Sequence, residues 1–70
     1  MEKDVVYIDR QGPIGVIVLN QPKKKNAISA VMMDKLADAL NELEEDEGVR
    51  VIALTGEGEN FCAGGDLDQP

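Results

Sequence analysis

The residues best suited to chemistry lie near the end of the chain, in the stretch GEGENFCAGGDL at positions 56–67, which holds four glycines, one cysteine and three acids. Glycine has no Cβ, so a ligand can approach the main chain closely at Gly64 and Gly65. A free backbone N–H there can donate to an oxygen that gains negative charge during a reaction, which makes one half of an oxyanion hole. A glycine turn that binds no ligand explains the same residues equally well. Asp66 can in addition cap a helix beginning just after it, and the dipole of that helix would favour the same charge.

Two nucleotide-binding motifs compete for this stretch. A dinucleotide fingerprint needs G-x-G-x-x-G after the first strand of its unit. Gly56 and Gly58 fit its first two positions, but Phe61 occupies the third, and the stretch follows the third expected strand. A P-loop is excluded because no lysine follows Gly64 or Gly65. A dinucleotide-binding half-domain therefore stays only as a weaker alternative.

The remaining reactive side chains carry little functional signal. The chain has no histidine, and its single cysteine, Cys62, cannot form an internal disulfide. We interpret Cys62 as a small buried hydrophobe in a protein of a reducing compartment. Glu57 and Glu59 lie near the glycines, and we expect them to be solvated. No metal site is expected.

Length and charge restrict the class of protein. Seventy residues make at most one small domain, and a formal net charge of −7 disfavours a nucleic-acid partner. The one basic run, Lys23 to Lys25, is typical of a solvated loop but is also able to meet a phosphate. No apolar run reaches the length of a membrane span, and the first ten residues lack the core of a signal peptide. We expect a soluble, cytoplasmic protein.

Apolar patterns predict three strands and one helix. β-Branched runs at 5–9 and 15–20, joined by a turn at 10–13, indicate an antiparallel hairpin. A loop at 21–27 follows, and the run at 49–55 is apolar enough for a buried parallel strand.

The helix is expected between the loop and the third strand, with Ser29 as its N-cap. Its core-facing stripe is predicted to be Met32, Leu36, Leu40 and Leu43, widened by Met33 and Ala37. Gly48 is expected to end the helix in a left-handed conformation. The acids at 44–47 are interpreted as a solvated helix end rather than a metal site.

The resulting order is β-β-α-β, an α/β segment in which a hairpin is followed by a right-handed βαβ crossover. A parallel sheet normally needs cover on both faces, and a single helix covers only one. The sequence therefore predicts that residues 1–70 form a single partial domain.

Six short motifs, in order and at matching spacing, resemble the N-terminal region of the crotonase superfamily, that is, the enoyl-CoA hydratase/isomerase family. The resemblance covers nearly the whole chain. Its motifs are Leu19-Asn20-Gln21-Pro22, Asn26-Ala27, Asp46, Val49-Arg50, Thr55-Gly56 and Phe61-Cys62-Ala63-Gly64-Gly65-Asp66.

This resemblance implies an acyl-CoA substrate, with coenzyme A as part of that thioester and no separate cofactor. By position, the backbone N–H of Gly65 would be one of the two donors that hold the thioester oxygen as it becomes enolate-like. The implied substrate-binding residues are Lys23, Ala63, Gly64, Gly65, Asp66 and Leu67. Lys23 matches a position that contacts CoA, whereas Lys24 and Lys25 are expected to face solvent.

The family's second oxyanion donor and its acidic general acid and base match nothing in this chain. We therefore predict a segment of an acyl-CoA-transforming enzyme, a lyase or isomerase of fatty acid metabolism, that is inactive alone. The alternative is a structural or folding fragment that binds no ligand. Intact family members commonly form trimers or hexamers, whereas unpaired sheet edges favour self-association of this segment.

Overall fold

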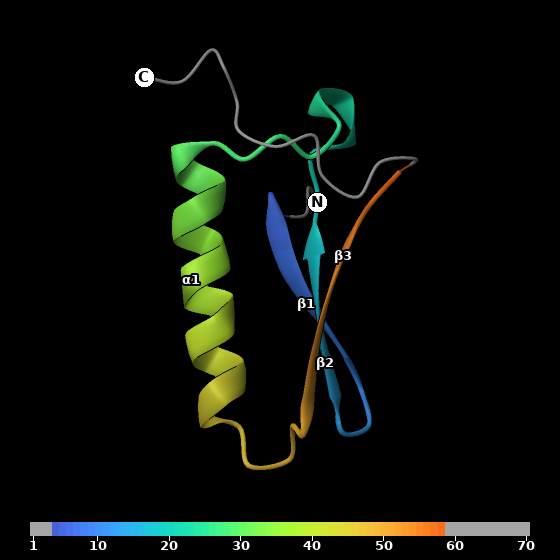
Figure 1. The fold of residues 1–70 in the computed structure, drawn as a ribbon, viewed down its shortest axis with the longest axis vertical. Helices are drawn as coiled ribbons and strands as arrows, with labels where there is room; N and C mark the ends of the chain where they lie inside the picture. The colour runs from blue at the N-terminus through green and yellow to red at the C-terminus, as the bar shows by residue number, and fades with distance from the viewer. Residues whose placement is uncertain (1–3, 59–70) are drawn as a thin grey trace.

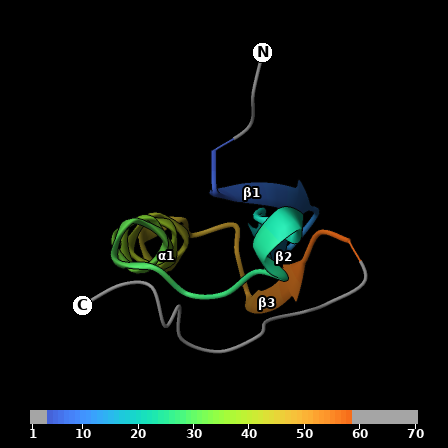
Figure 2. The ribbon, with the colours of Figure 1, turned by 90° about the horizontal axis from the view of Figure 1, so that it is seen from above.

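The structure is a computed structural model that describes residues 4–58. Within these residues, three strands form one sheet in the order β1-β2-β3, and one long helix lies against one face of it (Figures 1 and 2). Its elements are β1 (Val6–Gln11), β2 (Ile14–Leu19), the short 3₁₀ helix η1 (Pro22–Lys24), α1 (Ala30–Glu45) and β3 (Val51–Gly56). The predicted β-β-α-β order is confirmed, while η1 was expected only as loop.

The antiparallel hairpin of β1 and β2 pairs Val6 with Leu19 at one end and Gln11 with Ile14 at the other. Gly12 makes the turn at a φ of 60°, in the left-handed region that glycine enters without strain. Pro13 follows with a fixed φ and no N–H to satisfy. The turn residues thus set the register that the apolar alternation requires.

Strands β2 and β3 are parallel, as predicted, with Leu19 opposite Gly56. Both strands therefore end at the same edge of the sheet. Beyond the last pair, the Glu57 N–H donates to the Leu19 carbonyl over 2.8 Å. At the other end of this strand pair, where β2 and β3 begin, the N–H groups of Arg50 and Val51 donate to the Pro13 carbonyl over 2.7 and 3.2 Å.

Helix α1 begins at its predicted cap, where Ser29 Oγ accepts from the Met32 N–H over 3.2 Å. The predicted core stripe is only partly right. Met32 and Leu43 are buried and Leu36 is partly buried, but Ala39 takes the place expected for Leu40, which is 38% exposed. Met33 and Ala37 also face outward. The helix packs against β1 and β2, which rotates its buried face away from these residues.

The end of α1 differs from the prediction. The helix ends at Glu45, Asp46 is extended, and Gly48 does not adopt a positive φ. Instead, Asp46 Oδ1 accepts from the Gly48 N–H over 2.9 Å, so a side chain closes the turn in place of a left-handed glycine. Asp46 is half-buried rather than fully solvated, whereas the neighbouring acids Glu44, Glu45 and Glu47 are exposed as expected.

The core lies between α1 and the β1–β2 half of the sheet. Its fully buried apolar side chains are Ile17, Leu19, Met32 and Leu43. Gly15 makes room for Leu43, because a Cβ built on Gly15 would lie 2.6 Å from Leu43 Cδ2.

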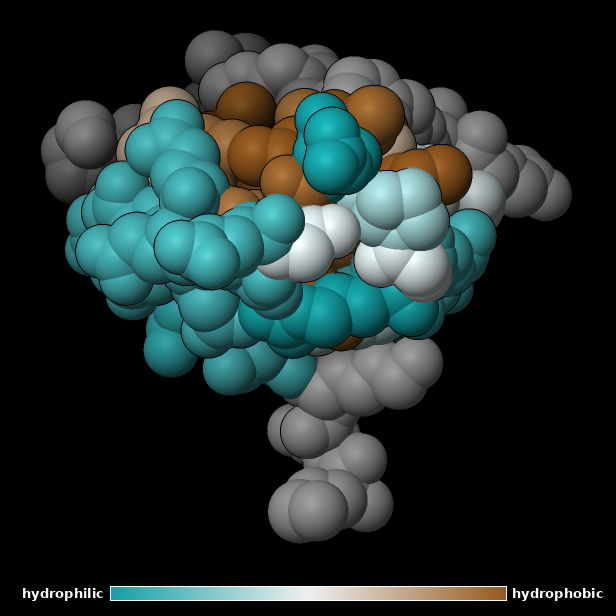
Figure 3. All heavy atoms as spheres, turned by 90° about the horizontal axis from the view of Figure 1, so that it is seen from below, coloured by the Kyte–Doolittle hydropathy of each residue, from teal (hydrophilic) through white to brown (hydrophobic). Residues whose placement is uncertain are grey.

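Strand β3 is not buried, contrary to the prediction. Val51, Ile52 and Leu54 are 54%, 38% and 44% exposed. Register places Ile52 and Leu54 on the face that carries α1, yet the helix covers β1 and β2 instead. Figure 3 shows hydrophobic surface open to solvent at the end of the molecule where β3 begins. The apolar pattern of β3 thus identifies a strand suited to burial that the other described residues cover only in part.

Candidate functional site

The candidate site lies where β2 and β3 both end. The loop after β2, residues 20–27, contacts Glu57 and Gly58, which follow β3. In open α/β folds, ligands bind outside the carboxyl ends of parallel strands. This region, residues 20–27 with 57–58, is called the site end below.

Asn26 joins the two segments of the site end. Its side chain is 0% exposed and its φ is 57°. Asn26 Oδ1 accepts from the Gln21 N–H over 2.8 Å, and Asn26 Nδ2 donates to the Glu57 carbonyl over 2.9 Å. The Asn26 N–H also donates to the Gln21 carbonyl over 2.9 Å. Asparagine suits the position because it tolerates a left-handed backbone and carries both a donor and an acceptor.

The loop between Gln21 and Asn26 is a tight turn. Pro22 opens η1, where its missing N–H costs nothing. The Lys24 N–H donates to the Gln21 carbonyl and the Lys25 N–H to the Pro22 carbonyl, each over 3.0 Å. Lys25 has a φ of 53°, which is unusual for a residue with a Cβ. The turn fixes the backbone of Lys23 and leaves its side chain exposed.

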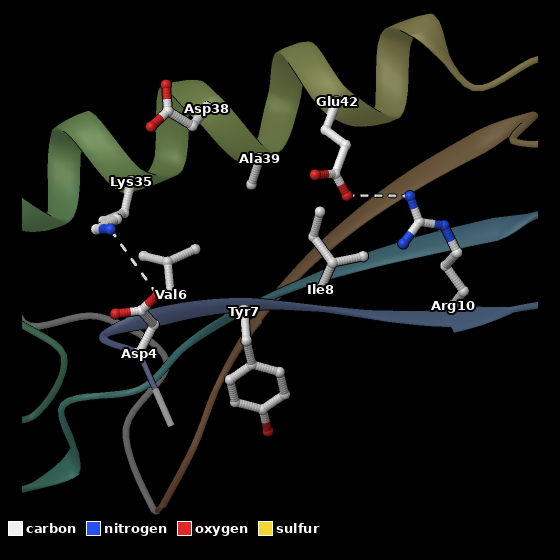
Figure 4. A pocket seen from close by; sticks show the side chains of 9 residues that line it. All are labelled: Asp4, Val6, Tyr7, Ile8, Arg10, Lys35, Asp38, Ala39 and Glu42. Atoms are coloured by element: carbon white, nitrogen blue, oxygen red, sulfur yellow. Dashed lines mark hydrogen bonds and ion pairs between the residues drawn. The ribbon is translucent and has the colours of Figure 1, made fainter. Parts of the chain in front are cut away.

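Glu57 is held in three ways rather than solvated, which corrects the sequence expectation. Its N–H donates to the Leu19 carbonyl, its own carbonyl accepts from Asn26, and its carboxylate accepts from the Tyr7 hydroxyl. Tyr7 projects from β1 on the side away from α1 (Figure 4). A side chain from the far edge strand therefore contributes to the site end.

Gly58 brings the end of β3 against the loop. It has a φ of 83°, and a Cβ built on it would lie 2.9 Å from Pro22 Cβ. A larger residue would be strained by its backbone and would displace Pro22. The glycine that mimics a dinucleotide fingerprint in sequence thus allows a close contact between two loops.

A small hollow of about 390 Å³ adjoins this loop, lined by Val5, Asn20, Gln21, Pro22, Lys23 and Lys24. Its walls are largely apolar, and the two lysines among them are exposed. Gln21 Oε1 is buried and has no hydrogen-bond partner among the described residues. Asn20 is fixed to the start of β1, because its N–H donates to the Val5 carbonyl over 2.7 Å and its Nδ2 to the Asp4 carbonyl over 3.0 Å.

Of the predicted site residues, Lys23 lies at the site end. The other predictions, Ala63, Gly64, Gly65, Asp66 and Leu67, lie outside the described residues, as do Glu59, Phe61 and Cys62. In the sequence, Asn26 stands out only as part of a motif, with no predicted role of its own. The one signal available was an asparagine, a residue that tolerates positive φ, at the end of a loop before a capped helix.

A larger hollow of about 560 Å³ opens between α1 and β1 (Figure 4). It is rimmed by charge: Arg10 pairs with Glu42 at 3.1 Å and with Asp46 at 3.2 Å, and Lys35 lies 3.8 Å from Asp4. The bonds to Glu42 and Asp46 raise the pKa of Arg10. The Gly48 N–H and then Arg10 lower the pKa of Asp46. Lys23, the one predicted site residue that the structure describes, does not line this hollow.

Within residues 4–58, no group of three or more histidine, cysteine, aspartate or glutamate side chains is placed to hold a metal ion. The helices in that part of the chain are too short or too polar to cross a membrane.

Comparison with known proteins identifies the class. The family profile described as enoyl-CoA hydratase/isomerase matches residues 9–70. The chain therefore belongs to the enoyl-CoA hydratase/isomerase family, as the sequence motifs predicted.

Individual relatives agree with this assignment. The chain is 45% identical over 68 residues to the "probable enoyl-CoA hydratase 1, peroxisomal" of Arabidopsis thaliana, covering 96% of this chain and 26% of that protein. It is 37% identical over 62 residues to 3-hydroxyisobutyryl-CoA hydrolase 1 of the same plant, covering 89% of this chain and 16% of the relative. The chain thus spans about a quarter or less of the length of these relatives, and it corresponds to their N-terminal part.

A solved structure supports the fold. The crystal structure of an enoyl-CoA hydratase from Mycobacterium tuberculosis H37Rv superposes with a TM-score of 0.89 at 42% identity, covering 94% of this chain and 26% of that one. The three strands and the helix therefore form the N-terminal segment of a crotonase fold.

Proposed function

We propose that this chain is the part of an acyl-CoA-transforming enzyme, of hydratase or isomerase type, that supplies one oxyanion donor and part of the CoA pocket. In this proposal the backbone N–H of Gly65 donates to the thioester oxygen as it gains negative charge. Lys23 contacts the CoA portion, and main-chain groups at Ala63, Gly64, Asp66 and Leu67 complete this side of the pocket. Coenzyme A enters only as part of the substrate, with no further cofactor.

The observation that supports this proposal is the joining of the Lys23 loop to the end of β3. Asn26 and the contact between Pro22 and Gly58 hold η1 beside the strand end. The motif from Phe61 to Leu67 follows that strand end within a few residues. The ammonium of Lys23 is thus presented at the edge of the sheet from which the motif departs. An exposed lysine on a rigid turn suits the phosphates of CoA, which bind as anions.

The 70-residue chain is proposed to be inactive alone. The supporting facts are that it spans about a quarter of the length of the Arabidopsis hydratase and that its sequence has no acidic pair recognisable as general acid and base. Binding of CoA by one side of a pocket is expected to be weak, in the millimolar to high micromolar range, roughly 4 to 6 kcal/mol.

A calorimetric titration of CoA into the chain tests the proposal, with Lys23→Gln and Lys25→Gln as a matched pair. Both variants remove one positive charge from the same turn. We expect Lys23→Gln to weaken CoA binding about five-fold and Lys25→Gln to weaken it less than about two-fold. Equal effects would show that Lys23 acts only through its positive charge and not through its position. No binding at millimolar CoA would leave only the alternative of a structural fragment that binds no ligand.

Two further assays complete the test. Enoyl-CoA hydration is expected to stay at the uncatalysed rate, and turnover near that of an intact enzyme would overturn the proposed inactivity. Titration with NADH addresses the weaker dinucleotide alternative, and tighter binding of NADH than of CoA would favour it.

A further inference from the structure

Asn26 occupies the centre of the site end without reaching the surface, and we propose that it is a positioning residue for Lys23. The inference rests on the proposed function of Lys23 as a CoA contact, but it concerns a different residue. Asn26 would not touch the ligand, since it is 0% exposed. It would act by fixing the turn that carries Lys23 relative to β3.

The turn is fixed through Gln21, the residue just before η1. Gln21 exchanges two hydrogen bonds with Asn26, accepting from its N–H over 2.9 Å and donating to its Oδ1 over 2.8 Å. The Gln21 carbonyl also accepts from the Lys24 N–H over 3.0 Å. The two ends of the turn are therefore tied to each other twice, once through the backbone N–H of Asn26 and once through its side chain.

The same side chain reaches the other half of the site end. Asn26 Nδ2 donates to the Glu57 carbonyl over 2.9 Å, and the Glu57 N–H is paired with the Leu19 carbonyl. Because Glu57 is also held by Tyr7, it offers a fixed point rather than a mobile one. The hydrogen bonds that place Lys23 against the end of β3 thus pass through the buried side chain of Asn26, and the contact between Pro22 and Gly58 adds to them.

A positioning role for Asn26 and a role in stability alone predict different results. If Asn26 places Lys23, the contribution of Lys23 to CoA binding depends on Asn26, and the two substitutions are not additive. If Asn26 only stabilises the fold, its loss raises the unfolded fraction but leaves the contribution of Lys23 unchanged.

The experiment is a double-mutant cycle with CoA as the probe. Asn26→Asp keeps the acceptor for the Gln21 N–H and the short side chain, but loses the donor to Glu57. Lys23→Gln is measured in the wild-type chain, in Asn26→Asp and in Ile17→Val, a core variant that lowers stability away from the site end. We expect Lys23→Gln to weaken binding about five-fold in wild type and Ile17→Val, and less than about two-fold in Asn26→Asp. The same factor in all three backgrounds would overturn the proposal.

A ligand-free measurement separates this proposal from the proposed function. Amide hydrogen exchange is compared between the turn, at Lys24, Lys25 and Ala27, and the middle of α1. In Asn26→Asp we expect the turn amides to lose about ten-fold more protection than the helix, while Ile17→Val changes both equally. This result together with absent CoA binding would reject the proposed function alone. Equal loss across the chain in Asn26→Asp would reject the positioning role.

Discussion

The two ends of the β2–β3 pair are closed in different ways. At the site end, a buried amide, Asn26, joins the two connecting segments. The opposite end, residues 11–13 with 46–50, is called the turn end. There the polar contacts are exposed: Asp46 accepts from Gly48 and from Arg10, and Arg10 also pairs with Glu42.

The difference shows which end tolerates change. An exposed ion pair exchanges readily for water and contributes little to stability. The partners of a buried amide cannot bond to water instead, so removing that side chain leaves them unsatisfied. The end that carries the proposed binding function is therefore the end built to keep a single geometry. At the turn end, backbone bonds to the Pro13 carbonyl and the packing of Leu43 over Gly15 lie beneath the exposed charges.

The largest effect is expected from Asn26→Ala, because it leaves the Gln21 N–H and the Glu57 carbonyl without their partner. We expect a loss of about 2–4 kcal/mol in the free energy of unfolding, measured by urea denaturation. If the variant is only marginally stable, sulfate is added to raise the stability of all variants alike. Asn26→Gly removes the same bonds but accepts the positive φ, so it should be the less destabilised of the two by about 1 kcal/mol. A loss below that of an average surface substitution would contradict the importance of the site end.

Gly15→Ala tests whether packing, rather than charge, holds the turn end. The added Cβ would lie 2.6 Å from Cδ2 of Leu43, a side chain that is only 1% exposed. We expect a loss of about 1–3 kcal/mol in thermal or chemical unfolding. Adding Leu43→Val should recover part of it, and strictly additive losses would show that the two residues do not compete for space.

Tyr7→Phe removes the hydroxyl that donates to the Glu57 carboxylate. Because that contact is only partly buried, we expect a loss of about 1 kcal/mol in the free energy of unfolding. The same change should increase amide exchange at Glu57 more than in α1. A uniform change along the chain would indicate that Tyr7 supports the sheet and not the site end.

The smallest effect is expected at the turn end, from Asp46→Asn. The pKa of Asp46 is lowered in the folded state, so the folded chain binds fewer protons there than the unfolded chain. This stabilisation is present above the ordinary carboxyl pKa and is lost as pH falls through the lowered value. Asp46→Asn should therefore make the free energy of unfolding fall less steeply as the pH is lowered. Glu47→Gln, at an exposed neighbouring position, serves as the control. Identical acid profiles for the two variants would show that the contacts of Asp46 are not coupled to folding.

Much of this fold follows from local sequence signals. The strand positions follow from β-branched runs, the hairpin from Gly12 and Pro13, and the helix start from Ser29, each of which acts within a few residues. The buried face of α1 was predicted only in part, and the burial of β3 was predicted wrongly, because both depend on where the helix sits across the sheet. Periodicity shows that a strand or helix is apolar on a face, but not which neighbour covers it.

The candidate site was predictable to a smaller extent. Lys23 and the motif from Ala63 to Leu67 came from resemblance to a family, and Lys23 alone lies in the described part of the chain. Asn26 was missed because its role depends on Gln21 and Glu57, and Glu57 becomes its neighbour only when β3 pairs with β2.

The most direct test of the central claim is a ¹H–¹⁵N NMR titration of the chain with CoA. The account predicts that the amides that shift belong to the site end and its continuation, residues 21–27, 57–58 and 63–67, with the turn end unchanged. Shifts confined to the turn end or to the hollow between α1 and β1, or no shifts at millimolar CoA, would contradict it.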